Sequence, residues 1–252
     1  MLDDRIKNRY GTAEWFEQAY KNVHEDPWGL AWRPSQLLRY ERVLTALDVV
    51  APPPVRAIDV GCATGDFTDL LGKHFPGMQR IVGVDFVDSA LERARGRFPH
   101  LTFAKESVLS LEDKYAGQFD LLTCLEVIYY VERDQQVKAL RSLRSTLRPG
   151  GYALFSSFIS PAPHFYPDEF VNLISSEFEV VTTQIIYLRL VSLIEKLGDR
   201  LERLLSLQHQ GTAFGHKYGK LSPLAVTAVE RWSRRLALLA GSHTIVLARN
   251  RG

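Results

Sequence analysis

The stretch AIDVGCATGDF at residues 57–67 decides the fold. An apolar run ends in a glycine-interrupted turn, and Asp59 stands just before the first glycine, Gly61. A buried strand that runs into such a turn is typical of a βαβ unit, in which the turn brings bare backbone close to a ligand. The remaining sequence has to indicate which ligand this turn holds.

Short apolar runs and helical patterns alternate along the rest of the chain. The apolar runs are VRAIDVG, RIVGVDF, LTFAKES, FDLLTCLEV and YALFSSF, and the helical pattern before the last of them stops at Pro149-Gly150-Gly151. Two further strand-like segments are the first part of EFEVVTTQIIYLRL and SHTIVLARN. The pattern predicts an α/β fold with a Rossmann-like, doubly wound, mostly parallel seven-stranded sheet.

Four regions follow from this pattern. Residues 1–50 are predicted to form an N-terminal helical lid interrupted near Pro27, Gly29 and Pro34, and residues 51–186 to form the α/β core. Residues 187–241 form a helical insertion, first through LRLVSLIEKLGDRLERLLSL and then through a helix that starts at Ser222 and closes at Gly241. Residues 242–252 hold the last strand. The insertion can cap a substrate pocket or form a packing or dimer surface.

Composition sets the broad class of protein. The 252 residues are 46% hydrophobic and 24% charged, which is ordinary for a globular protein. No stretch resembles a signal peptide or reaches the ~18 apolar residues of a membrane span. Cys62 and Cys124 are too few for a disulfide framework, and the seven histidines show no metal-ligand spacing, so we expect a cytoplasmic protein without a metal site.

The net charge of +2 hides an asymmetry. From residue 187 onward the chain has 11 Lys and Arg against 4 Asp and Glu. This basic segment indicates either a surface for an anionic partner or a solvated helix face. The sequence favours the second interpretation, and no nucleic-acid partner is expected.

The residues of the turn do not match the common phosphate-binding motifs. A nicotinamide fingerprint needs glycines where this chain has Gly61, Ala63 and Asp66, and the lysine of a Walker motif is absent. Asp66 also places a negative charge where phosphates would lie. The turn therefore favours a nucleoside with a cationic or zwitterionic arm.

Four segments together resemble a known family. AIDVGCATGDF, IVGVDFVDSALERAR, FDLLTCLEVIYYV and LRPGG are similar, in order and spacing, to the motifs of class I S-adenosylmethionine-dependent methyltransferases. The resemblance covers about residues 55–158 and implies S-adenosyl-L-methionine as cofactor, with S-adenosyl-L-homocysteine as product. It also implies transfer of a methyl group to nitrogen or oxygen.

The resemblance assigns roles to residues of the first two strand ends. Gly61 and Gly65 let the backbone approach the methionyl portion, and Ala63 departs from the usual glycine. Asp59 orients the loop and the ammonium side of the cofactor. Asp85 accepts the two ribose hydroxyls, because one carboxylate offers two acceptor oxygens, and Phe86 lies against adenine.

Other contacts to the cofactor are less closely determined. The segment FAKESVLSL offers Ser107, Glu106 or the backbone of Val108 to the adenine amino group. The region DPWGLAWRPSQLLRYERVLTAL, followed by EVIYYV, is similar to nodulation-type N-methyltransferases, which modify the amino group of a chitooligosaccharide precursor. Tyr20, Trp28 and Arg33 are expected to line the lid, with core packing as the alternative for the two aromatic residues.

The methyl-accepting end is expected after the fourth strand. Glu126, Tyr129 and Tyr130 follow that strand and should face the methyl group. His164, in the next loop, is the candidate base for a hydroxyl acceptor, with a plain surface histidine as the alternative. The sequence favours a small acceptor such as a sugar, amino sugar or secondary metabolite, and a monomer or homodimer. A nucleic-acid or protein methyltransferase and a non-catalytic cofactor-binding protein remain as alternatives.

Overall fold

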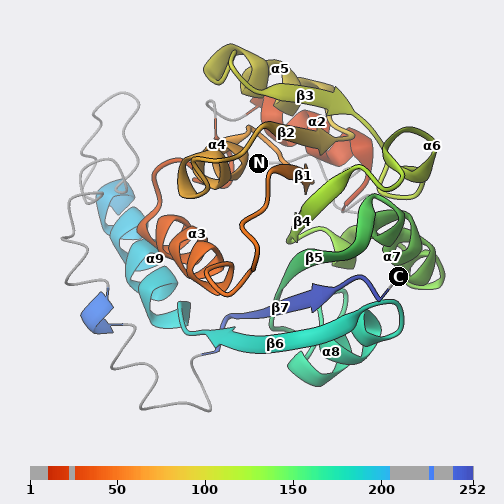
Figure 1. Ribbon diagram of the computed structural model, residues 1–252. Helices are drawn as coiled ribbons and strands as arrows, with labels where there is room; N and C mark the ends of the chain where they lie inside the picture. Colours follow the sequence, from red (N-terminus) through yellow and green to blue (C-terminus); the bar gives the residue numbers. More distant parts are fainter. Residues whose placement is uncertain (1–10, 23–25, 205–226, 230–240, 252) are drawn as a thin grey trace.

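The structure is a computed structural model that describes residues 11–22, 26–204, 227–229 and 241–251. One seven-stranded sheet organises the described chain (Figure 1), with the strand order β3-β2-β1-β4-β5-β7-β6. Strand β7 pairs antiparallel with both β5 and β6, and the other pairs are parallel. The strands are β1 Arg56–Val60, β2 Arg80–Asp85, β3 Thr102–Lys105, β4 Phe119–Leu125, β5 Leu147–Phe158, β6 Glu179–Ile186 and β7 His243–Arg249. The mostly parallel sheet confirms the expected fold class.

The described helices are α2 Ala13–Asn22, α3 Pro34–Ala46, α4 Asp66–His74, α5 Asp88–Arg97, α6 Glu112–Tyr115, α7 Gln136–Ser145, α8 Pro167–Ser175 and α9 Arg189–Leu204. Two short 3₁₀ turns, Ile128–Tyr130 and Arg133–Gln135, follow β4. The sequence pattern had indicated neither α6 nor α8. The expected insertion helix that starts at Ser222 lies outside the described residues apart from 227–229, whereas α9 is present where the first insertion helix was expected.

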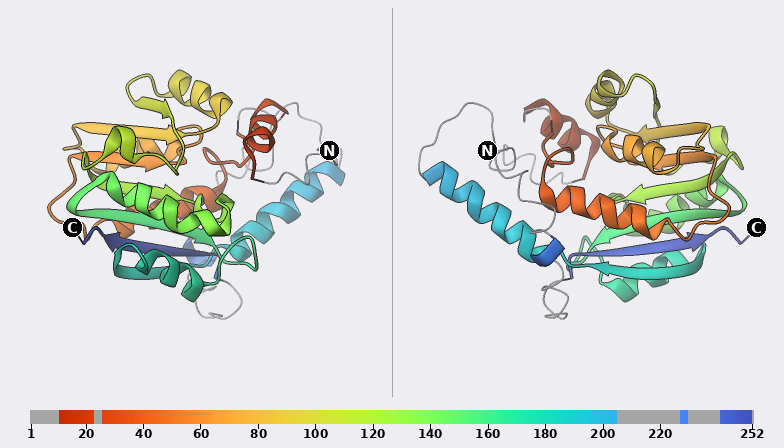
Figure 2. Two further views of the ribbon diagram at one scale, coloured as in Figure 1. Left: turned by 90° about the vertical axis from the view of Figure 1, so that its right-hand side faces the viewer. Right: turned by 60° about the vertical axis from the view of Figure 1, so that its left-hand side comes forward.

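Helices cover both faces of the sheet (Figure 2). Side chains of α7 and α8 pack on one face, in a cluster that includes Ile58 of β1, and side chains of α3, α4 and α9 pack on the other, in a cluster that includes Ala57. Neighbouring residues of β1 thus face opposite layers, as the pleat of a strand requires. Burial on both faces explains why the sequence shows continuous apolar runs rather than alternation.

Strand β5 begins earlier than the sequence indicated. Helix α7 ends at Ser145, and β5 starts at Leu147, ahead of Pro149-Gly150-Gly151. The prediction that the helix continues to Pro149 is therefore wrong at its end. Asn250 explains the difference, because its backbone pairs with Gly150 and Gly151 and its side-chain amide donates to the carbonyl of Leu147 at 3.2 Å. A partner so distant in sequence is invisible to a local pattern.

The order of the strands runs in opposite directions on the two sides of β1. Strand β1 pairs with β2 on one side and with β4 on the other, which makes the space beyond its carboxyl end the expected ligand site of a doubly wound sheet. His243, the first residue of the antiparallel β7, pairs with Phe158 at the carboxyl end of β5. The start of β7 therefore lies at the same edge.

Hydrogen bonds to α5 hold helix α2 at that edge of the sheet. The Glu17 carboxylate accepts the backbone N–H of Asp88 at 2.7 Å, at the amino-terminal end of α5, where unpaired N–H groups favour an anion. The Arg93 guanidinium donates to the carbonyl of Tyr20. Among the described residues, no helix is both long and apolar enough to cross a membrane.

Candidate active site

A cavity of about 570 Å³ opens at the carboxyl edge of the sheet. Its wall combines the turn after β1, the ends of β2 and β4, the start of β7, and residues of α2 and α3. Of the residues singled out in the sequence, it brings together Tyr20, Trp28, Asp59, Gly61, Ala63, Asp85, Phe86, Glu106, Ser107, Val108, Glu126, Tyr129, Tyr130 and His164. Gly65 and Arg33 are not part of the wall.

In the turn after β1, backbone that is not covered by side chains borders the cavity. Gly61 has φ +75°, and a Cβ added there would overlap the Val127 side chain. Ala63 also adopts a positive φ, 49°, which costs a residue with a Cβ more than it costs glycine. The N–H groups of Gly61 and Cys62 donate to the Val84 carbonyl at 2.8 and 3.0 Å, so the turn is tied to β2.

Gly65 serves the packing behind the turn instead. It has φ +81° at the start of α4, and a Cβ there would come within 2.7 Å of the Phe103 ring. Arg33 lies at the start of α3, where its guanidinium stacks on the Trp32 ring at 4.9 Å. The cofactor contacts expected of these two residues are therefore not supported by the geometry.

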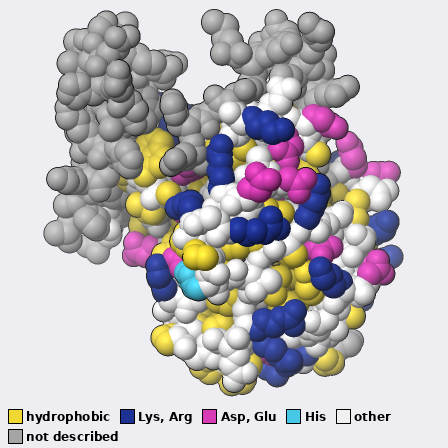
Figure 3. All heavy atoms as spheres, turned by 90° about the horizontal axis from the view of Figure 1, so that it is seen from above, with side chains coloured by type: hydrophobic (Ala, Val, Ile, Leu, Met, Phe, Trp, Pro, Cys, Tyr) yellow, Lys and Arg dark blue, Asp and Glu magenta, His cyan; other side chains and the backbone are white. Residues whose placement is uncertain are grey.

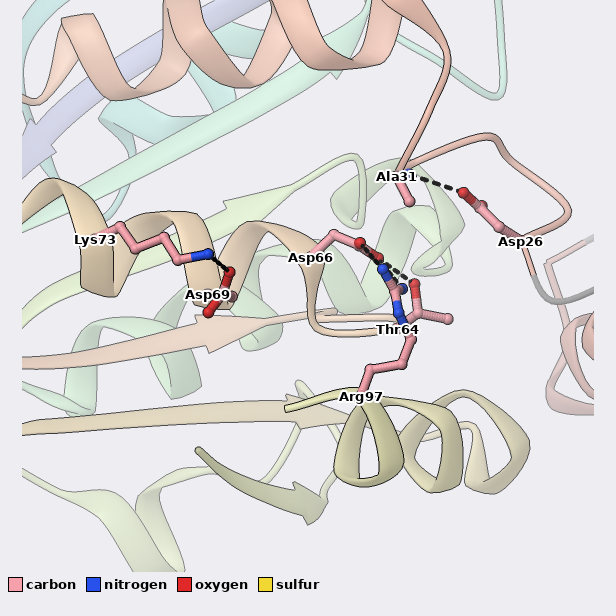
Figure 4. A network of polar contacts seen from close by, with 7 residues as sticks. All are labelled: Asp26, Ala31, Thr64, Asp66, Asp69, Lys73 and Arg97. Atoms are coloured by element: carbon pink, nitrogen blue, oxygen red, sulfur yellow. Dashed lines mark hydrogen bonds and ion pairs between the residues drawn. The ribbon is translucent and has the colours of Figure 1, made fainter. Parts of the chain in front are cut away.

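Asp66 points toward Arg97 of α5 (Figure 4). Its carboxylate accepts two N–H groups of Arg97 at 2.7 and 2.5 Å and the Thr64 hydroxyl at 2.6 Å. It does not line the cavity. The sequence argument placed this charge at the ligand, whereas the structure pairs it with α5, where a bidentate arginine neutralises it.

Two buried carboxylates lie beneath the turn. Asp59 accepts the hydroxyls of Thr68 and Thr123 at 2.6 and 2.8 Å, and burial raises its pKa to about 6. Asp85, at the end of β2, accepts the N–H groups of Ala63 and Val87 at 2.9 and 3.0 Å, and burial raises its pKa as well. A carboxylate has about four acceptor sites, so Asp85 can accept a further hydroxyl donor from a ligand.

An aromatic group closes the cavity above Asp85. Phe86 is 37% exposed and contacts Phe16 of α2 edge-on, with ring centroids 5.6 Å apart. Trp28 stacks on Trp15 at 5.5 Å, and burial raises the pKa of Tyr20. This end offers flat apolar surfaces around a carboxylate, which suits a nucleoside.

Glu126 dominates the other end of the cavity. Its backbone is in the left-handed region, with φ 59°, directly after β4. Its carboxylate accepts the Ser156 hydroxyl at 2.6 Å and the Tyr129 hydroxyl at 3.3 Å. Burial acts to raise the pKa of Glu126, but the electrostatic influence of His243, the positive charge of Arg39 and these hydrogen bonds outweigh it, so the pKa lies below its usual value. Glu126 is therefore held ionised.

Sequence reasoning missed Arg39. Its side chain is only 5% exposed in the wall of the cavity, and its Nη1 lies 3.7 Å from a Glu126 oxygen. The Nε donates to Gln36 at 2.9 Å, whereas Nη1 has no hydrogen-bond partner among the described residues. A buried guanidinium nitrogen aimed at a cavity fits an anionic group of a ligand. The helical position of Arg39 carried no motif that could have indicated it.

Sequence reasoning also missed His243. The ring lines the cavity and packs edge-on against Phe158, with centroids 5.3 Å apart. His164 packs against Phe158 from another direction, at 5.4 Å, and against Tyr129 at 4.5 Å. The available signal was the position of His243 at the start of a final strand, since the first residue of an antiparallel strand lies at the ligand edge.

Among the described residues, no group of three His, Cys, Asp or Glu side chains could hold a metal ion. The surface around the sheet carries acidic and basic side chains intermixed with hydrophobic ones (Figure 3). Most of the basic residues counted after residue 187 lie where side chains are not described, so the interpretation of that segment remains a prediction.

Comparisons with known proteins agree with this geometry. Residues 57–151 match the family model of a methyltransferase domain. This region of the chain is therefore similar in sequence to a methyltransferase domain. The chain is 32% identical over 137 residues to nodulation protein S of Rhizobium tropici. The aligned region covers 53% of this chain and 55% of that protein. Trans-aconitate 2-methyltransferase of Agrobacterium fabrum is 32% identical over 128 residues, 48% of each chain. The chain thus spans about half the length of these curated relatives.

Solved structures extend the likeness of the methyltransferase domain to the whole fold. The N-methyltransferase NodS from Bradyrhizobium japonicum, in complex with S-adenosylhomocysteine, has a TM-score of 0.62 at 19% identity and covers 94% of this chain and 98% of its own. The [4+2]-cyclase SpnF has a TM-score of 0.58 at 15% identity, with 85% and 82% covered. Because a cyclase shares the fold, the fold alone does not decide the reaction.

Proposed function

We propose that this protein is an S-adenosylmethionine-dependent methyltransferase that acts on a nitrogen or oxygen atom of a small molecule. The observation that carries the proposal is one cavity with two chemically different ends: a carboxylate among aromatic rings at the end of β2, and Glu126 with two histidines around β4 and β7. The first end suits a nucleoside, and the second suits a polar acceptor.

The residues of the wall fit the proposed cofactor. Asp85 accepts the ribose hydroxyls, Phe86 lies against the base, and the bare backbone at Gly61 admits the chain of the amino acid. Arg39 Nη1, which has no hydrogen-bond partner among the described residues, donates to the carboxylate of the cofactor. The bound cofactor supplies a methyl group made electrophilic by a positively charged sulfur.

The protein then contributes mainly alignment and exclusion of water. Holding a nucleophile in line with a reactive centre can lower the barrier by about 7–11 kcal/mol. Hydrogen bonds from Tyr129 and Ser156 hold the Glu126 carboxylate in one orientation. A carboxylate held in this way can orient the acceptor. Ser192, on the insertion helix α9, also lines the cavity, which supports the interpretation of α9 as part of a cap over the acceptor.

The substrate class follows from size and polarity. A cavity of this volume, shared with a cofactor, leaves room for a small molecule rather than for a duplex or a folded protein. The relatives named above include a nodulation protein and a methyltransferase for trans-aconitate, so we propose an amino sugar, a sugar or a small polar metabolite as acceptor.

Methyl transfer itself tests the proposal. Purified protein would be incubated with S-adenosylmethionine labelled in the methyl group and with glucosamine, a hydroxylated metabolite and a carboxylate acceptor in separate reactions. The proposal predicts label in at least one acceptor, with stoichiometric release of S-adenosylhomocysteine. Binding of S-adenosylhomocysteine without transfer to any acceptor would favour a non-catalytic or differently catalytic protein on the same fold.

A further inference from the structure

His243 has a defined hydrogen-bond partner on one ring nitrogen. Its Nδ1 lies 2.8 Å from the Ser242 hydroxyl oxygen. That hydroxyl donates its single hydrogen to the Ile186 carbonyl at 3.0 Å and accepts the backbone N–H of Leu188 at 3.0 Å. A hydroxyl has one hydrogen and two lone pairs, so only a lone pair remains for the histidine.

This arrangement favours one tautomer. With the hydroxyl hydrogen directed to Ile186, Nδ1 carries the ring hydrogen and donates it to Ser242, which leaves an unprotonated lone pair on Nε2. No hydrogen bond to Nε2 occurs within the part of the chain that the structure describes, and the ring lines the cavity beside Glu126. His164 differs, since its ring contacts Tyr129 and Phe158, and no hydrogen bond to either of its ring nitrogens occurs among the described residues.

We propose that His243 is a catalytic residue whose Nε2 accepts the hydrogen of the N–H or O–H group that becomes methylated. This inference rests on the proposed function and narrows its substrate class. A carboxylate oxygen presents only lone pairs, which would face the lone pair of Nε2 and the charge of Glu126. The acceptor is therefore an amine or a hydroxyl, not a carboxylate.

Its role differs between the two acceptors. A neutral amine attacks with its own lone pair and keeps its proton, so His243 only orients the nitrogen by accepting an N–H. A hydroxyl becomes strongly acidic as its oxygen gains the methyl group; the O–H bond then breaks, an N–H bond forms at Nε2, and the imidazolium faces the Glu126 carboxylate until water takes the proton.

The charges around the ring keep it neutral before reaction. Burial lowers the pKa of His243 to about 4, and Arg39 of α3, Arg189 of α9 and His164 act in the same direction, whereas Glu126 opposes them. The lone pair of Nε2 is thus available at neutral pH. A hydroxyl that is being methylated is far more acidic than such an imidazolium, so this weak base suffices for it.

The tautomer can be measured without any acceptor. Protein with ¹⁵N-labelled histidine would be saturated with S-adenosylhomocysteine, and long-range ¹H–¹⁵N spectra recorded at pH 7, with His243→Asn assigning the signals. We expect a protonated Nδ1 and an unprotonated Nε2. An Nε2–H tautomer or an imidazolium at pH 7, in a protein that binds S-adenosylhomocysteine, would overturn the role of His243 alone; absence of that binding would instead contradict the proposed function.

Variants test the chemistry of Nε2. Asparagine can replace Nδ1 but not reach Nε2, whereas the longer glutamine can reach the Nε2 position. With a hydroxylated metabolite as probe, for which Nε2 takes the proton, we expect His243→Asn to lower the rate by about 10² or more and His243→Gln to recover part of it, with unchanged S-adenosylhomocysteine affinity. His100→Asn, on the exposed surface, is the control. Equal rates for wild type and His243→Asn, or methylation of trans-aconitate in preference to glucosamine, would overturn the inference.

Discussion

The two ends of the cavity are built from the chain in different ways. The cofactor end comes from consecutive pieces, the turn after β1 and the ends of β2 and β3, each of which follows its own strand in the sequence. The acceptor end combines Glu126 and His243, which are separated by a long stretch of chain. Local sequence therefore describes the first end well, and only the folded sheet brings the second end together.

The largest expected effect tests the cofactor end. Replacing Asp85 by alanine removes two charge-assisted acceptors for the ribose, so we expect S-adenosylhomocysteine affinity to fall by about 1.5–3 kcal/mol, roughly 10- to 150-fold. Calorimetric titration measures it. Asp88→Ala is the matched control, because that carboxylate is exposed and pairs with Lys105. Equal affinity in Asp85→Ala and wild type would remove Asp85 from the site.

The turn itself gives the second prediction. Alanine at Gly61 requires a left-handed backbone and overlaps Val127, so we expect a loss of about 1–3 kcal/mol in the free energy of unfolding, together with weaker cofactor binding. Gly96→Ala, inside α5 with no atom near an added Cβ, should stabilise by about 0.5–1 kcal/mol. Denaturant unfolding compares the two. A Gly61→Ala protein as stable as wild type would contradict the proposed close approach.

This contrast defines how much of the molecule could be predicted. The strand and turn at residues 57–67 and the seven strands follow from local sequence patterns, and the carboxylate at Asp85 follows from the resemblance of its segment to a known motif. The start of β5 at Leu147 could not be predicted, because it depends on Asn250 at the far end of the chain. Arg39 and His243 could not be predicted for the same reason, because neither belongs to a local motif. Their proposed roles depend on their nearness to Glu126, which arises only in the folded sheet.

A contact between helices α3 and α9, which are far apart in the sequence, gives the third prediction. Helix α3 begins without a side-chain cap of its own, and Glu195 of α9 supplies one by accepting the Ser35 N–H at 2.8 Å and hydroxyl at 2.7 Å. Glu195→Ala should cost about 0.5–2 kcal/mol of stability, as lost caps do. We expect a larger loss of acceptor turnover than of cofactor affinity.

Lys196→Ala, the exposed neighbour on the same helix, is the control for Glu195→Ala. Thermal unfolding and S-adenosylhomocysteine titration are measured on both. If Glu195→Ala weakens cofactor binding more than methyl transfer, α9 does not belong to the acceptor end as proposed.

The last prediction is a pH dependence. Burial raises the pKa of Asp59 from 3.8 to about 6, so the folded protein binds this proton more tightly than the unfolded chain. The free energy of unfolding should therefore fall as pH rises through that window and level off above it. Asp59→Asn should flatten this slope in denaturant titrations at pH 4.5 and pH 7, with Asp88→Asn as control. An unchanged slope in Asp59→Asn would show that other groups cause it.

Titration calorimetry of the wild-type protein with S-adenosylhomocysteine, and with NAD as the competing dinucleotide, tests the central claim most directly. The geometry of Gly61, Asp85 and Arg39 predicts micromolar binding of S-adenosylhomocysteine and no binding of NAD. Binding of NAD alone, or of neither ligand, would contradict the assignment of this cavity to a methyltransferase.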